Sequence, residues 1–383
     1  MNRGKNNNTA FSLFFIIRFT KKPITNFDNF MNIAILANKL FSNQSSKFKE
    51  LLVQTIFKKY CSGDNRFLFI SNSKTKIFDK VVASCETIFL NPVGDNRFTR
   101  KIWWDYKLPR QLSKIKAELL ISFDDQLVLN TTIPQCLVLE LNKKVNEKYL
   151  NKAAVIIVES QKQKKEIAGK GKINADKIQV VYPYTSVESG NIKYDSRQET
   201  KEKYTEGKEF FLYKGGFEKP ENFVNLLKGF SHFKNRQKSN FNLVLINCDE
   251  KLFVKDISSY KYRRDIKFIE INDKEEEGRV LGSAYGLLAP FDEKNDMMIT
   301  LEGMQSGIPV IVADNSTAIE LAKDGCLVAG TNGPKEVGEK MILLYVNETL
   351  RTEYISKAKL NAETYTIERT SEMLWKGLQQ FMR

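Results

Sequence analysis

Histidine is almost absent from this sequence, because its 383 residues include only one, His232. A single histidine excludes a zinc site built from several imidazoles, and it leaves His232 as the only residue that could supply a histidine-dependent catalytic triad. Cysteine is sparse as well. The five cysteines are odd in number and widely spaced, and most lie in or beside apolar runs: Cys61, Cys85, Cys136, Cys248 and Cys326. This pattern predicts a reducing compartment, with neither a disulfide framework nor a metal cluster.

Long apolar runs are also missing. No stretch reaches the roughly 18 apolar residues that a bilayer-spanning helix needs. The first thirty residues are basic and Asn-rich, with a short apolar patch at Phe11–Ile17. A secretory signal has this order of charge and apolar residues, but Arg18 follows at once and no small-residue cleavage site appears. We therefore expect residues 1–30 to be a disordered extension and Met31 to open the first domain, and both Met1 and Met31 remain candidates for the true start.

Positive charge, in contrast, is plentiful, since the formal net charge is +14. Such a balance favours anionic partners. The lysines are scattered along the chain, and neither a zinc-finger spacing nor an RNP-type aromatic motif accompanies them, so we expect no nucleic-acid partner. A diphosphate ligand or an anionic membrane surface fits the charge at least as well.

Short apolar runs alternate with longer helical stretches from Met31 onward, which predicts parallel sheets covered on both faces. The expected strands of the first half are Asn32–Ala37, Arg66–Ser71, Thr87–Leu90, Glu118–Ser122, Cys136–Leu141, Ala154–Glu159 and Ile178–Tyr182. Those of the second half are Phe210–Lys214, Asn242–Ile246, Ile266–Ile271, Ala284–Ala289, Pro309–Ala313 and Cys326–Ala329. Helices are expected at Lys47–Tyr60, at Leu108–Lys116 and near Thr370–Phe381.

This alternation predicts an α/β protein with two Rossmann-like domains that face each other across a cleft. The first domain would span residues 31–188 and the second residues 209–355. The polar segment between them, residues 189–208, is the expected linker. Residues 356–383 would form C-terminal helices, for which a return to the first domain is left open.

The first candidate site follows the strand Phe210–Lys214. Two glycines, Gly215 and Gly216, come directly after this strand, and a helical run starts near Asn222. Glycines let the backbone approach a ligand closely, and a helix N-terminus offers free N–H groups to an anion. Lys214 and Lys219 would add positive charge for a diphosphate. An ordinary strand–turn–helix junction has the same pattern.

The second candidate site is the stretch from Glu302 to Ala313. A helix carrying Glu302 near its start is expected to end at Gly307, and Pro309 would open a buried strand. A carboxylate at a helix start commonly only complements the helix dipole. It can also accept hydrogen bonds from both hydroxyls of a ribose.

Together these two stretches resemble the family 4 glycosyltransferases, which have the GT-B fold. The strand–Gly-Gly–helix signature falls on Lys214–Asn222, and the donor-binding helix and following strand fall on Leu301–Ala313. A weaker likeness extends over Met31–Arg383. The resemblance implies a retaining, metal-independent transfer of sugar from a nucleotide-sugar donor to a glycan or lipid-linked acceptor, without a cofactor. The basic charge of the chain favours a lipid-linked or cell-envelope acceptor at the cytoplasmic face of the membrane. We therefore expect a cytoplasmic role in cell-envelope polysaccharide biosynthesis, with a peripheral contact at the inner face of the membrane left open.

The resemblance also assigns residues to the donor site. Donor contacts would come from Gly215, Gly216, Lys219, Asn222 and Glu302, and the secondary candidates are Lys214, Glu293, Lys294 and Thr300. It assigns no catalytic residue and no metal ligand.

Four departures from the family pattern favour a second hypothesis. Lys294 stands where a first glutamate is usual, and Pro220-Glu221 stands where an Arg-Lys pair is usual. The His-Asp element expected after Glu140 is absent, and the loop Asn38–Ser42 has no glycine. Since a diphosphate leaving group needs positive charge in the transition state, the chain could instead be a degenerate glycosyltransferase that binds or scaffolds a partner. An epimerase or a phosphorylase-like enzyme on the same architecture is a third alternative.

Overall fold

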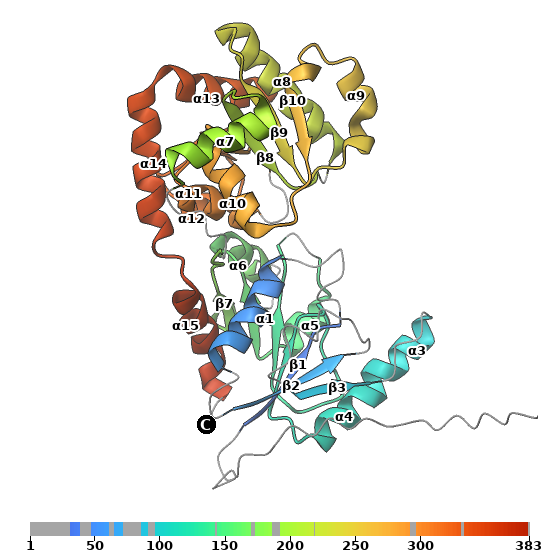
Figure 1. Cartoon of the computed structure of the whole chain (residues 1–383). Helices are drawn as coiled ribbons and strands as arrows, with labels where there is room; N and C mark the ends of the chain where they lie inside the picture. Colours follow the sequence, from blue (N-terminus) through green and yellow to red (C-terminus); the bar gives the residue numbers. More distant parts are fainter. Residues whose placement is uncertain are drawn as a thin grey trace, which may run out of the picture.

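The computed structural model has two α/β domains, and the C-terminal helices lie one after another along one side of both (Figure 1). It describes residues 31–38, 47–60, 65–71, 86–90, 96–141, 144–169, 173–185, 192–217, 219–291, 296–330 and 333–381. The expected extension at residues 1–30 lies outside these ranges, as do Glu293 and Lys294.

The N-terminal domain is built on a seven-stranded sheet with the order β3-β2-β1-β4-β5-β6-β7, in which every pair is parallel. Four of its strands are buried along their whole length or nearly so, as expected when helices cover both faces of a sheet. The strands are β1 (Asn32–Leu36), β2 (Arg66–Ser71), β3 (Glu86–Phe89), β4 (Leu119–Ser122), β5 (Gln135–Val138), β6 (Val155–Val158) and β7 (Ile178–Val180).

The helices of this domain include one continuous but irregular stretch. Helix α3 (Arg97–Ile102) passes into a π-helical turn (Trp103–Lys107) and then into α4 (Leu108–Lys114). Asn96 caps the start of α3 by accepting a hydrogen bond from the Thr99 N–H at 2.8 Å. The other helical segments are α1 (Lys47–Tyr60), α5 (Glu147–Lys152), α6 (Gln161–Ala168) and the short 3₁₀ helix Ala175–Lys177.

The C-terminal domain has a six-stranded parallel sheet with the order β10-β9-β8-β11-β12-β13. Its strands are β8 (Phe210–Lys214), β9 (Asn242–Ile246), β10 (Ile266–Ile269), β11 (Gly286–Ala289), β12 (Val310–Ala313) and β13 (Leu327–Ala329). All thirteen strands expected from the sequence are thus confirmed, with ends that shift by up to three residues. The helices are α7 (Tyr194–Thr205), α8 (Pro220–Gln237), α9 (Val254–Ser258), α10 (Lys274–Ser283), α11 (Asp296–Gln305), α12 (Ile319–Ala322), α13 (Pro334–Val346) and α14 (Glu348–Ala362). Short 3₁₀ helices lie at Glu250–Phe253 and Arg263–Asp265.

Helices α8 and α13 cover one face of this sheet and pack closely against each other. Two glycines allow the approach, because a Cβ atom added to Gly338 would lie 2.6 Å from the carbonyl oxygen of Gly229. The only histidine also lies at this contact, since His232 Nε2 is 2.6 Å from Glu339 Oε1. His232 therefore links α8 to α13, the two helices that cover this face of the sheet.

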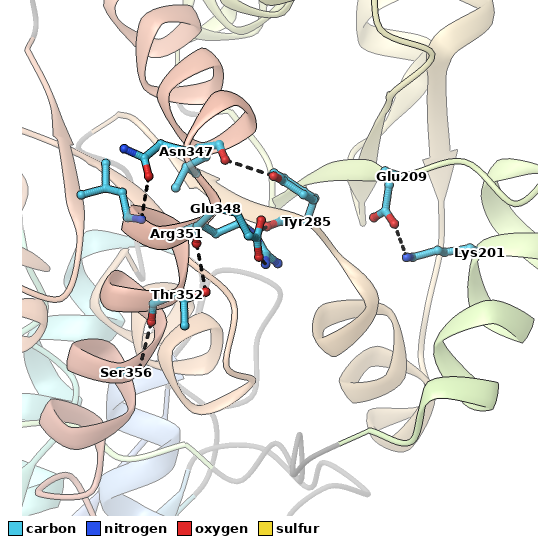
Figure 2. A network of polar contacts seen from close by, with 10 residues as sticks. Lys201, Glu209, Tyr285, Asn347, Glu348, Arg351, Thr352 and Ser356 are labelled. Carbon is cyan, nitrogen blue, oxygen red and sulfur yellow. Dashed lines mark hydrogen bonds and ion pairs between the residues drawn. The ribbon is translucent and has the colours of Figure 1, made fainter.

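The segment predicted as a linker contains a helix instead. Helix α7 occupies Tyr194–Thr205 and packs against α10. It buries Thr200, Lys201 and Thr205, and the buried Lys201 is held by Glu209 at 2.5 Å (Figure 2). The local pattern did not predict this helix, because it buries polar side chains, whereas an apolar stripe is the usual signal of a packed helix.

A different network fixes the start of the helix that leaves this domain (Figure 2). Asn347 ends α13 and caps α14 by accepting a hydrogen bond from the Leu350 N–H at 2.9 Å. Arg351 then lies 4.4 Å from the centre of the Tyr285 ring, and the Tyr285 hydroxyl donates to the Leu344 carbonyl at 3.0 Å. These contacts attach α14 to the residue that precedes β11.

The last helix, α15 (Ile367–Leu378), packs against the N-terminal domain and is followed by a 3₁₀ turn at Gln379–Phe381. Leu374 and Leu378 belong to the same buried cluster as residues of β1, α1 and β6. The Thr370 hydroxyl also donates to the Tyr182 carbonyl at 2.8 Å. The C-terminal helices therefore connect both domains along one side, as the red helices of Figure 1 show.

Candidate functional site

The chain order reverses between two neighbouring strands of the C-terminal sheet, β8 and β11. In open parallel sheets, ligands bind outside the carboxyl ends of the strands at such a reversal. Gly215 and Gly216 follow β8 at this edge. Gly215 has φ +98°, a conformation that favours glycine. Among the described residues other than its two chain neighbours, no atom lies within 4 Å of the position that a Cβ of Gly216 would take. The backbone of Gly216 is therefore open to close approach by a ligand.

Two contacts hold this glycine turn in place. The Gly215 N–H donates to the Ile246 carbonyl at 3.0 Å, which continues the pairing of β8 with β9. The Cys248 thiol lies 2.7 Å from the Gly215 carbonyl oxygen. Burial raises the pKa of this thiol to about 12, so it stays protonated and can donate to that carbonyl.

Helix α8 begins a few residues after the glycines. Its N-cap residue is the exposed Lys219, no side chain caps its first turn, and Pro220 supplies no N–H. Asn222 is half-buried, and its N–H donates to the Lys219 carbonyl at 3.0 Å. The first turn also carries Glu221, whose charge opposes an incoming anion. Lys219 is thus the only cation at residues 219–222 of the described chain.

The strongest electrostatic feature of the site is a buried ion cluster formed by Lys214, Glu277 and Glu302. Lys214, at the end of β8, forms an ion pair with Glu302 of α11 and a second one of 2.6 Å with Glu277 of α10. The three side chains are 3%, 15% and 5% exposed, in the order Lys214, Glu277 and Glu302. Burial by itself would lower the pKa of Lys214, but the two carboxylates outweigh it and the pKa is raised. Lys214 is therefore a charged ammonium that holds two carboxylates.

Glu302 uses only one of its oxygens in this cluster. Lys214 contacts Oε2, whereas Oε1 accepts no hydrogen bond from any residue in the described part of the chain. Glu302 also lies one helical turn after Met298, which packs into the core of the N-terminal domain. The free oxygen can accept hydrogen bonds from hydroxyl groups of a ligand at the edge next to Gly215.

Two expectations about this helix need correction. Helix α11 begins at Asp296, so Glu302 is its seventh residue and does not lie near its start. An interaction of this carboxylate with the helix N-terminus is therefore excluded, and its charge is balanced by Lys214. Thr300 is fully buried, and it lies two residues before Glu302, which places the two side chains on different faces of the helix. The structure does not bring Thr300 to the Lys214–Glu302 pair.

Carboxylates gather at the carboxyl edge of the N-terminal sheet as well. Asp124 and Asp125 follow β4, Glu140 follows β5 and Glu159 follows β6, and all four are buried. Lys49 of α1 forms an ion pair with Asp125 and donates to the Phe123 carbonyl at 2.8 Å.

Glu159 lies in a strongly desolvating environment at this edge. Its Oε1 accepts a hydrogen bond from the Leu141 N–H at 2.8 Å. Burial raises the pKa of Glu159 to about 7, since the Leu141 hydrogen bond and the charge of Lys49 offset this effect only in part and nearby Glu140 adds to it. This edge therefore holds a carboxyl group that changes its charge near neutral pH.

Comparison with known proteins identifies the architecture. Residues 195–361 match the family model described as "Glycosyl transferases group 1". The fold is that of the GT-B glycosyltransferases. A glycosyltransferase from Rickettsia africae ESF-5 has a TM-score of 0.75 and 14% identity over 93% of this chain and 99% of that chain. Anabaena HepE in complex with UDP and glucose has a TM-score of 0.71 and 13% identity, over 91% of this chain and 99% of that chain. WaaG, a glycosyltransferase involved in lipopolysaccharide biosynthesis, has a TM-score of 0.67 and 13% identity, over 89% of this chain and 98% of that chain. None of the curated proteins compared with the chain matches it.

The two domains of this GT-B fold meet at their carboxyl edges. Glu320 of α12 accepts hydrogen bonds from the N–H groups of Gln161 and Lys162, both at 2.7 Å, at the start of α6. The Tyr182 hydroxyl donates to the same carboxylate at 3.3 Å, and Lys162 Nζ donates to the Asn315 carbonyl at 2.6 Å. Burial and the charge of Glu320 raise the pKa of Tyr182 to about 12, so the hydroxyl keeps its proton.

Sequence reasoning missed Glu277 and the carboxylates of the N-terminal edge. Glu277 lies in the run Lys274-Glu275-Glu276-Glu277, which has the composition of an ordinary solvated helix start. Nothing in that run marks which glutamate turns inward. A weak signal did exist for Asp124 and Glu159, because each follows a strongly apolar strand directly, where the carboxyl ends of a parallel sheet collect polar side chains.

Proposed function

We propose that the protein is a glycosyltransferase that moves a sugar from a nucleotide-sugar donor to a glycan or lipid-linked acceptor. The observation that carries the proposal is the Glu302 carboxylate at the strand reversal. Lys214, the residue before the Gly215–Gly216 turn, holds its Oε2, and its Oε1 accepts no hydrogen bond from a described residue. In this proposal Glu302 accepts hydrogen bonds from the ribose hydroxyls. The diphosphate lies against Gly215 and Gly216, near the exposed Lys219. The complex of Anabaena HepE with UDP and glucose supports a uridine nucleotide as the first donor to test.

The transfer is proposed to retain the anomeric configuration and to need no metal ion. The bond between sugar C1 and the diphosphate oxygen breaks, and the acceptor oxygen bonds to C1 on the same face. The acceptor proton passes to the leaving diphosphate. NMR of the product anomer tests retention, and activity that survives EDTA tests the absence of a metal requirement. An inverted anomer would contradict the retaining mechanism.

Cell-envelope synthesis at the inner face of the cytoplasmic membrane is the proposed setting. The support is the role of WaaG in lipopolysaccharide biosynthesis together with the net charge of +14 of this chain. Among the described helices, none has both the length and the apolar composition to cross a membrane.

Nucleotide titration of Glu302→Gln tests the donor site. The variant keeps the size of the side chain but loses a charge-assisted hydrogen bond, which is worth about 1.5–3 kcal/mol. We therefore expect UDP to bind roughly 10- to 150-fold more weakly in isothermal titration calorimetry. The matched control is Glu275→Gln on the exposed face of α10, where the carboxylate pairs only with Arg279 among the described residues and affinity should not change.

The same titration decides about the alternative function, a catalytically degenerate protein that binds or scaffolds a partner. Pro220 and Glu221 favour this alternative, because they leave the first turn of α8 without the cations that a leaving diphosphate needs. If the unmodified protein binds none of UDP, GDP and ADP, the transferase proposal is contradicted. Equal affinity of the Glu302→Gln variant and the unmodified protein would instead mean that the ribose lies elsewhere.

A further inference from the structure

The continuous helix from α3 to α4 exposes an unusual set of side chains. Phe98 is 72% exposed and Tyr106 is 70% exposed, which is rare for such large rings. Six exposed cationic side chains accompany them between residues 98 and 116, against a single carboxylate, Asp105. The cations are Arg100, Lys101, Lys107, Arg110, Lys114 and Lys116. Exposed aromatic and cationic groups are therefore concentrated on one helix, although the lysines of the whole chain are scattered.

The π-helical turn at Trp103–Lys107 places the two rings on the same side of this helix. An α-helix advances by about 100° per residue and would separate positions 98 and 106 by about 80°. A π-turn advances by less per residue, because it closes its hydrogen bonds at i+5. The rings of Phe98 and Tyr106 are thereby brought nearly into line. The exposed residues Lys101, Arg110 and Lys114 flank them.

The opposite side of the helix is fixed in the protein core. Trp103, Leu108 and Leu112 are almost completely buried, and they pack in one cluster with residues of β1, β2 and β4. The Trp104 ring packs edge-on against Trp103 with their centroids 5.5 Å apart. Figure 1 shows α3 and α4 at the outer edge of the N-terminal domain, with α3 projecting from it. The exposed side is thus presented by a rigidly anchored helix.

We propose that this exposed side, formed by Phe98, Lys101, Tyr106, Arg110 and Lys114, docks the protein on an anionic lipid bilayer. Aromatic rings are favoured at the level of the lipid headgroups. The three cations of this side belong to the six exposed ones between residues 98 and 116, and clusters of about four to eight Lys or Arg residues fit anionic headgroups. A single convex helix with two rings along one line suits a flat surface, whereas nucleic-acid binding by stacking usually needs a groove or a sheet. The inference rests on the proposed function in one respect, since a transferase for a lipid-linked acceptor has to meet a bilayer.

Vesicle sedimentation of the full chain tests the proposal. Vesicles of phosphatidylglycerol and phosphatidylcholine should bind the protein, vesicles of phosphatidylcholine alone should not, and added salt should weaken the binding. The triple variant Lys101→Gln, Arg110→Gln, Lys114→Gln should bind roughly 100-fold more weakly, at about fivefold per cation. Phe98→Ser with Tyr106→Ser should weaken binding by roughly tenfold or more without removing any charge.

A control variant removes the same charge and an exposed ring from the other domain. Lys228→Gln, Arg236→Gln and Lys251→Gln, combined with Tyr194→Ser, alter exposed residues of α8, the 3₁₀ helix Glu250–Phe253 and α7. Its vesicle binding should stay within about twofold of the unmodified protein. Equal losses of vesicle binding in the control and the α3–α4 variants would overturn the proposal, as would a failure of the unmodified protein to bind anionic vesicles. The proposal would also be overturned if the α3–α4 variants lost binding to an RNA oligonucleotide but kept their binding to vesicles. UDP titration of the same variants separates this outcome from a failure of the proposed transferase function, because the α3–α4 residues lie outside the donor site.

Discussion

The two domains share one architecture but equip the carboxyl edges of their sheets differently. The C-terminal edge has an open glycine turn and a buried ammonium, Lys214, that balances two carboxylates. The N-terminal edge has four buried carboxylates in Asp124, Asp125, Glu140 and Glu159, with Lys49 as a neighbouring ammonium. The open glycine backbone beside the exposed Lys219 suits an anionic ligand such as a diphosphate. Carboxylates suit hydroxyl groups, such as those of a sugar acceptor. The same fold can therefore present two edges of different chemistry to two substrates.

Among the substitutions that test this difference between the two edges, removal of Lys214 is expected to have the largest effect on the free energy of unfolding. Lys214→Met would leave Glu277 and Glu302 buried without their ammonium, and an uncompensated buried charge costs about 3–5 kcal/mol. We expect the free energy of unfolding in urea to fall by that amount. The exposed Lys203, which pairs with Glu276, offers the control Lys203→Met, whose effect on the free energy of unfolding should be far smaller because solvent screens an exposed ion pair.

A double variant shows whether the cost comes from the cluster itself. Adding Glu302→Gln to Lys214→Met removes one of the two unpaired carboxylates, so part of the lost stability should return. Purely additive losses would mean that Lys214 and Glu302 do not interact in solution. In that case the difference between the two edges would have to rest on the glycine turn alone.

Glu159 tests the other edge through the pH dependence of stability. Its pKa in the folded protein is about 7, above the value of 4.5 for an unperturbed glutamate. The folded state therefore binds more protons than the unfolded state between these values, so the contribution is fully present below pH 4.5 and is lost as the pH rises through 7. Glu159→Gln should remove this loss and raise the free energy of unfolding at pH 8 by roughly 3 kcal/mol at most.

Urea unfolding of both proteins at pH 5 and pH 8 measures this effect. The difference in the free energy of unfolding between Glu159→Gln and the unmodified protein should be small at pH 5 and large at pH 8, because all other groups titrate alike in both proteins. Glu166→Gln on the exposed face of α6 serves as the control, with no such pH dependence. A pH-independent difference for Glu159→Gln would show that this carboxyl titrates normally.

The sequence predicted the sheets far better than the chemistry of their edges. Runs such as Phe210–Lys214 and Val155–Val158 are apolar and short, so their local pattern alone identifies buried parallel strands. The pairing of Lys214 with Glu302 spans 88 residues and depends on how α11 packs beside β8. No local pattern carries that information. Likewise, the start of α11 at Asp296 was not predicted, although Asn295 and Asp296 are residue types that favour a helix start. The residues between Asp296 and Glu302 are nearly all apolar, so they show no one-sided helical stripe.

The smallest expected effect concerns the contact that joins the two edges. Glu320 accepts the first N–H groups of α6, so it acts as a helix cap supplied by the other domain. Glu320→Gln keeps an acceptor oxygen but loses the charge that the helix N-terminus favours, at a cost of about 0.5–1 kcal/mol. Hydrogen exchange should therefore accelerate by roughly two- to fivefold at Gln161 and Lys162. The control Glu339→Gln removes a carboxylate that contacts His232 within the C-terminal domain, and it should leave these amides unchanged. Unaltered exchange in Glu320→Gln would mean that Glu320 does not hold the start of α6 in solution, and that the two edges are joined by the other contacts between the domains, such as that of Lys162 with the Asn315 carbonyl.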